Sequence, residues 1–138
     1  MNKQPRTNDS GQATAFLIVM ASALLLLVAF VFDIGAALAE RNRNIHIAQE
    51  AARAGAQQID LAAYRDDGTV SLDPAAATSA AEAFLTDAGV QGFATVDGNV
   101  VTVTAETTFV FRLLPVGART ASGTAGATPV TDTDPFFP

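Results

Sequence analysis

The stretch Ala13–Phe32, ATAFLIVMASALLLLVAFVF, decides the fold, because it runs for twenty residues without a charged side chain. A helix that rises about 1.5 Å per residue extends it to roughly 30 Å, the thickness of a bilayer's hydrocarbon core. Backbone polar groups in lipid must be satisfied within the segment, which requires a helix. Four central leucines, Leu24–Leu27, make that helix apolar all round. The sequence therefore predicts a transmembrane helix, which we place at residues 12–34.

A removable secretory signal is the alternative for an apolar stretch so near the N-terminus. The segment Met1–Gly11 carries two basic residues, Lys3 and Arg6, as such a signal would. However, the apolar run exceeds an ordinary signal core, and Ala36–Ala39 offers no clean cleavage site within a continuing helical pattern. Arginines on the far flank leave the positive-inside count undecided. We therefore expect a retained, single-pass helix with a cytoplasmic tail, residues 1–11, because short N-terminal tails usually stay inside.

The residues after the span continue the helix outside the membrane. Residues 36–63 contain no proline and one glycine, and they are rich in good helix formers. Small and aliphatic side chains recur there at helical spacing: Leu38, Ile45, Ala48, Ala52, Gly55 and Ile59. The sequence predicts one rod from the bilayer to about residue 63. For Ala48–Ile59 we favour packing on the chain's own sheet over an intermolecular bundle.

A second helix, 74–88, is predicted by Asp73 as N-cap, Pro74 at the first helical position and Gly89 as its stop. Its expected buried face consists of alanines and one aromatic residue: Ala76, Ala80, Ala83, Phe84 and Ala88.

Three strands follow, at about residues 93–96, 99–111 and 119–127. Asp97-Gly98 predicts a two-residue type I′ hairpin turn. Alternation in the second strand places Val101, Val103 and Ala105 on a buried face. We therefore expect an α+β fold in two layers, with an extracytoplasmic domain at 35–127 and a disordered tail at 128–138.

Composition excludes several classes of function. Net charge is −6, with thirteen acidic residues against six arginines after Phe32, so no basic face exists for nucleic acid. There is no cysteine and one histidine, His46, which leaves no metal-ligand set. The serines have no base partner within a motif, and Asp66-Asp67 is interpreted as a solvated turn. We expect no catalytic residue, no cofactor, no metal and no small-molecule substrate.

Several segments together resemble the TadE/TadG-like proteins of Flp (Tad) pilus systems, especially the short actinobacterial members. They are Gly11–Phe16 at the start of the apolar helix, Asp33-Ile34-Gly35 at its end, and Ala39-Glu40-Arg41 with Gln49–Ala56 beyond it. The resemblance covers Gly11 to about Gln58. It implies a type IV pilin-like subunit whose leader is cut by a prepilin peptidase, here between Gly11 and Gln12.

Phe16 stands at the fifth mature position, where pilins keep a glutamate. Such a glutamate neutralises a neighbouring subunit's N-terminal ammonium in a dry filament core, where an unpaired charge is costly. We therefore expect a minor subunit or assembly factor of a Flp/Tad-type pilus. Its expected partners are membrane lipid, sister pilus subunits or the Tad secretion machinery, and the prepilin peptidase. The alternative is a single-span anchor for an extracytoplasmic domain that binds a ligand or regulates a secretion machine.

The sequence allows two roles for Asp33 at the end of the apolar run. It marks where lipid ends, or it makes a polar contact with a partner helix at the membrane surface. For the second interpretation we name Phe16, Asp33 and Gly35 as contact residues.

Overall fold

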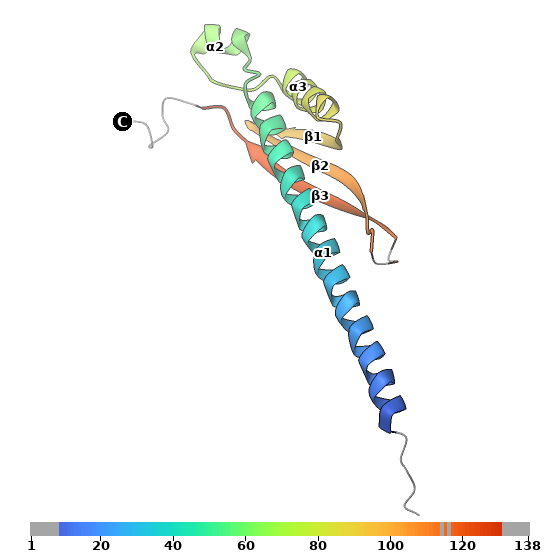
Figure 1. The fold of residues 1–138 in the computed structure, drawn as a ribbon. Helices are drawn as coiled ribbons and strands as arrows, with labels where there is room; N and C mark the ends of the chain where they lie inside the picture. The colour runs from blue at the N-terminus through green and yellow to red at the C-terminus, as the bar shows by residue number, and fades with distance from the viewer. Residues whose placement is uncertain (1–8, 114, 116, 131–138) are drawn as a thin grey trace, which may run out of the picture.

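The computed structural model describes residues 9–113, 115 and 117–130. One long helix, α1 (Asp9–Ala56), is followed by α2 (Leu61–Asp67) and α3 (Pro74–Asp87), and then by the strands β1 (Gln91–Asp97), β2 (Val100–Val110) and β3 (Ala118–Ala127). Figure 1 shows the sheet and α3 gathered beside the C-terminal half of α1, while its N-terminal half projects alone. The α+β fold predicted from the sequence is confirmed.

The projecting half of α1 is the predicted span. Its large side chains are exposed all round, with Phe16 at 67%, Leu25 at 72% and Phe32 at 61%. It is the one helix of the described chain that is long and apolar enough to cross a membrane. The helix continues without a break past Asp33 and Gly35 into the head. A single rod therefore joins the apolar half to the folded domain.

The rod ends at Ala56, earlier than the predicted residue 63. Gly55 packs so closely on α3 that an added Cβ would lie 2.9 Å from the Ala77 carbonyl oxygen. Beyond it the chain reverses, and Ile59 forms an isolated bridge with Leu72. Asp60 then starts a new helix, because its carboxylate accepts the backbone N–H groups of the first turn of α2. The helix expected over 57–63 is thus replaced by a turn and α2.

The predicted caps of α3 are confirmed. Asp73 accepts the N–H groups of Ala75 and Ala76, and Pro74 occupies the first turn. At the other end Gly89 has a φ of 68°, and Val90 N–H reaches the Leu85 carbonyl oxygen. This is a Schellman closure, which needs the left-handed conformation that glycine adopts without strain. The helix therefore stops where the sequence indicated.

The buried face of α3 differs from the prediction by one residue in register. Ala77, Ala81 and Leu85 are buried, with Phe84 and Ala88 packed partly against them. Ala76 and Ala80 are half-buried and Ala83 is exposed. Alanines fill both candidate faces, so hydrophobicity alone did not separate them, and Leu85 fixes which face turns inward.

The three strands form an antiparallel sheet in the order β1-β2-β3. Val101, Val103 and Ala105 are fully buried, as predicted. The turn between β1 and β2 differs from the predicted type I′ turn at Asp97-Gly98. Asp97 pairs with Val100, so Gly98 and Asn99 are the loop residues. Gly98 has a φ of 57°, and no non-glycine residue in the described chain has a positive φ, which is the sign pattern of type II′.

The core lies between α1, α3 and the inner face of the sheet. It is built mainly from alanines, including Ala48, Ala51 and Ala52 on α1, with Val101 and Val103 from β2 opposite them. The expectation that Ala48–Ile59 packs on the chain's own sheet is confirmed for Ala48, Ala52 and Gly55. Small side chains let α1 lie close to the strands, so backbone geometry rather than bulky side chains sets the contact.

Candidate functional site

Asp33 joins α1 to the end of the β2–β3 hairpin. Its side chain is 1% exposed, although it stands at the end of the apolar span. The carboxylate oxygens accept the backbone N–H groups of Arg112 at 3.3 Å and Leu113 at 3.0 Å. A carboxylate that accepts two amide hydrogens is a strong, charge-assisted contact. The hairpin end is therefore held level with the end of the span.

Asn44 makes a second polar contact on the same face of the rod. It lies eleven residues after Asp33, close to three full turns. Its amide donates to the Ala121 carbonyl oxygen at 2.8 Å and accepts from the Thr107 hydroxyl at 2.9 Å. The residue has no exposed surface. Both strands of the hairpin are therefore fixed to α1 at one point.

Gly123 makes this close approach possible. A Cβ added there would lie 2.4 Å from the backbone nitrogen of Ile45 and 2.6 Å from the carbonyl carbon of Asn44. A side chain at position 123 would not fit between β3 and α1. The backbone of the strand therefore rests directly on the backbone of the helix.

A small pocket of about 200 Å³ lies beneath the hairpin, lined by Phe32, Asp33, Ala36, Glu40, Phe109 and Arg112. Glu40 Oε2 is buried there without a hydrogen-bond donor, and its described ion-pair partner is Arg43 at 3.8 Å. Asp33 and Glu40 are seven residues apart, so both face the hairpin. The lower part of the contact between helix and hairpin is thus polar, in contrast to the alanine core above it.

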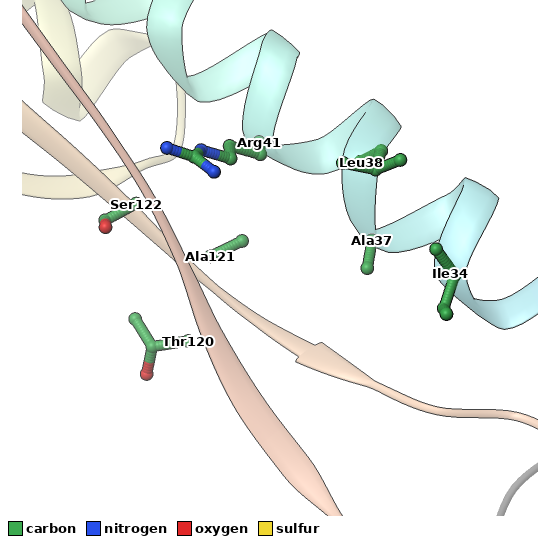
Figure 2. Close-up of a pocket in the computed structure, with 7 residues that line it drawn as sticks. All are labelled: Ile34, Ala37, Leu38, Arg41, Thr120, Ala121 and Ser122. Atoms are coloured by element: carbon green, nitrogen blue, oxygen red, sulfur yellow. The ribbon is translucent and has the colours of Figure 1, made fainter.

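An open groove lies between α1 and the free edge of β3. It measures about 350 Å³ and is lined by Ile34, Ala37, Leu38, Arg41, Thr120, Ala121 and Ser122. Figure 2 shows Ala121 pointing toward α1, while Thr120 and Ser122 point away and Arg41 extends from the helix toward β3. Leu38 is 55% exposed. The groove offers an apolar floor with one cation at its end.

The structure does not bring the three predicted contact residues together. Asp33 faces the chain's own hairpin, and Gly35, two residues on, points to nearly the opposite side of α1 with open space around it. Phe16 is exposed farther down the span. Gly11 and Gln12 are exposed in the first turns of α1. A contact of Phe16 or Gly35 with a partner helix, and cleavage at Gly11, stay predictions.

Asn44 and Gly123 were missed by sequence reasoning. Asn44 follows the polar segment Glu40–Arg43, so its position alone gave no reason to expect it to be buried. A periodic signal did exist, because residues 33, 37, 40, 44, 48, 51 and 55 follow one helical stripe. That stripe is polar in its lower half, so apolar periodicity favours a face with Leu38 and Ile45 instead.

These features define a class: a single-span membrane protein whose transmembrane helix is also the spine of a small α+β head. Residues 11–58 match the family described as "Putative Flp pilus-assembly TadE/G-like". The match begins at Gly11 and extends two residues beyond the end of α1, so it covers the rod and not the sheet. The resemblance stated from the sequence is confirmed over this segment. No curated protein and no solved structure gave a significant match to the chain.

Proposed function

We propose that the chain is a non-enzymatic, pilin-like membrane protein that acts as a minor subunit or assembly factor of a Flp/Tad-type pilus. One observation carries the proposal. The segment that matches the pilus-assembly family is a single rod, exposed all round over a bilayer's thickness and buried in the head beyond it. The N-terminus lies in the cytoplasm and the head outside. The rod binds neighbouring helices, and the head is presented to sister subunits.

The groove beside β3 is the surface we assign to a sister subunit. Ile34, Ala37 and Leu38 form an apolar strip at the upper end of the span, where a neighbouring helix would emerge from the bilayer. The small residues Ala37 and Ala121 permit close approach of that helix. Phe16 provides no acceptor for a neighbour's N-terminal ammonium, which supports a minor rather than a main polymerising role.

Two measurements in a host that carries the pilus system test this function. Mass spectrometry of the mature chain should give an N-terminus at Gln12, the product of a prepilin peptidase. An intact N-terminal segment would instead favour a permanent anchor for a binding or regulatory domain.

Recovery of sister subunits with the tagged full chain is the second measurement. Leu38→Asp should lower recovery by about tenfold, the effect of losing about 1.4 kcal/mol of binding. Leu61→Asp is the matched control, because Leu61 is similarly exposed, at 58%, but lies on α2 at the far end of the head. Equal recovery with both variants would exclude the groove as the contact.

A further inference from the structure

We propose that the end of the β2–β3 hairpin is a second membrane anchor, which inserts apolar side chains into the lipid interface beside the span. The described residues that carry it are Val110, Phe111, Leu113 and Pro115, with Arg112 and Arg119 at its edge. The proposal rests on α1 spanning a bilayer and not on the pilus role.

The end of the hairpin lies level with the upper end of the span. Asp33 holds the backbone of Arg112 and Leu113 through two hydrogen bonds, so this end of the hairpin lies beside the upper end of the span. Figure 1 shows the adjoining ends of β2 and β3 beside the middle of α1, at the opposite end of the head from α2. Whatever depth Asp33 has in the membrane, the hairpin end shares it.

The apolar surface of α1 continues beyond Asp33 as far as Ala39. The Asp33 carboxylate is buried against its own chain, so it presents almost no charged surface to lipid. Beyond it the sequence runs Ile34-Gly35-Ala36-Ala37-Leu38-Ala39, and the next charges are Glu40 and Arg41. The exposed apolar surface therefore extends from Ala13 to Ala39, about 40 Å of helix, enough for the hydrocarbon core and part of the interface. Asp33 and the hairpin end lie inside this belt rather than at its edge.

The end of the hairpin exposes apolar side chains at that level. Val110 is 57% exposed and Leu113 is 54% exposed. Phe109 and Phe111 stack edge to face, with ring centroids 5.1 Å apart, and remain partly accessible. Aromatic rings are favoured at membrane interfaces, and exposed aliphatic side chains gain free energy on leaving water.

Charge supports lipid as the occupant rather than a second acidic head. Arg112 and Arg119 are exposed beside the apolar tip, and Arg41 on α1 lines the groove beside β3. The other end of the head carries five carboxylates, around α2, at the start of α3 and at the turn between β1 and β2. They belong to Asp60, Asp66, Asp67, Asp73 and Asp97. Of the six arginines after the span, Arg53 and Arg65 lie at this far end, whereas Arg41, Arg43, Arg112 and Arg119 lie in the half of the head nearer the bilayer, where anionic headgroups attract cations. Two anchors on one rigid unit would fix the tilt of the head on the membrane.

Depth-resolved quenching tests the proposal in the full chain, because the native sequence has no cysteine. Single variants Leu113→Cys, Val110→Cys, Leu25→Cys and Leu61→Cys are labelled with an environment-sensitive dye. They are reconstituted in vesicles of phosphatidylcholine and phosphatidylglycerol that contain lipids with a doxyl quencher near the glycerol end or near the chain terminus. Leu25 is the deep control, and Leu61 is the equally exposed control in water.

We expect dye at positions 113 and 110 to show blue-shifted emission and several-fold more quenching than dye at position 61. The shallow quencher should be more effective there, and the deep quencher more effective at position 25. Quenching at positions 113 and 110 no stronger than at position 61, with position 25 still quenched, would overturn the proposal. So would a blue shift that appears only at high protein density without lipid quenching, which indicates a second copy. An unquenched position 25 would overturn the span itself. None of these outcomes depends on where the mature N-terminus lies.

Discussion

Gly123→Ala is expected to destabilise the head by about 3 kcal/mol, the upper part of the usual range for overpacking. The new Cβ would lie 2.4 Å from the backbone nitrogen of Ile45, and a helix backbone cannot move aside as a flexible side chain does. Displacing β3 would also stretch the hydrogen bond that the Asn44 amide donates to the Ala121 carbonyl oxygen on that strand. Hydrogen exchange of β2 amides in the full chain in detergent measures the effect, because it reports the free energy of opening directly.

Gly126→Ala is the matched control for this variant. It lies three residues farther along β3, and an added Cβ would meet its nearest neighbour, the Val101 carbonyl oxygen, at 3.7 Å, an ordinary contact. The expected change is within about 0.5 kcal/mol, since alanine also restricts the unfolded chain. Equal effects of the two substitutions would contradict the close crossing of β3 over α1.

Asp33→Ala is expected to release the hairpin end from the rod while leaving the alanine core folded. Two backbone N–H groups in a partly buried site would lose their acceptor, at a cost of about 2 kcal/mol. Exchange of the Arg112 and Leu113 amides should accelerate roughly thirtyfold, the equivalent of that free energy. Val101, which pairs with Ala127 at the other end of the hairpin, should change little.

Asp66→Ala is the control for removal of a carboxylate, because Asp66 is exposed on α2. The same Asp33 variant separates the two sequence interpretations of this residue. Unchanged amides of Arg112 and Leu113, together with loss of sister subunits, would show that Asp33 contacts a partner helix directly. Accelerated exchange with unchanged recovery would assign it to the chain's own hairpin alone.

Much of the fold could be predicted because its signals are local. The apolar run specifies the span, Asp73-Pro74 and Gly89 specify both ends of α3, and alternation of Val101 and Val103 specifies the buried face of β2. Each feature depends on one continuous stretch of sequence, so no tertiary information was needed. The continuous rod also followed, since no proline separates the span from the head and the single Gly35 there does not end the helix.

The polar contacts between α1 and the hairpin were not predictable in this way. Asp33 and Asn44 find their partners near residues 112 and 121, and a polar residue on a helix gives no sign of such a partner in sequence. Asp60 did carry a usable signal, because an aspartate before Leu-Ala-Ala is a good N-cap. The helix formers around it concealed the break after Ala56.

The continuity of the rod is the central claim, and one distance tests it most directly. Spin labels on Ala23→Cys in the span and Gln49→Cys in the head flank Asp33 and Gly35, and both positions are exposed. In lipid nanodiscs, pulsed electron paramagnetic resonance should give one narrow distribution of distances centred at about 39 Å, the rise of a straight helix over that interval. A broad distribution, or a markedly shorter distance, would show that the helix bends or breaks at the membrane surface and would contradict the claim.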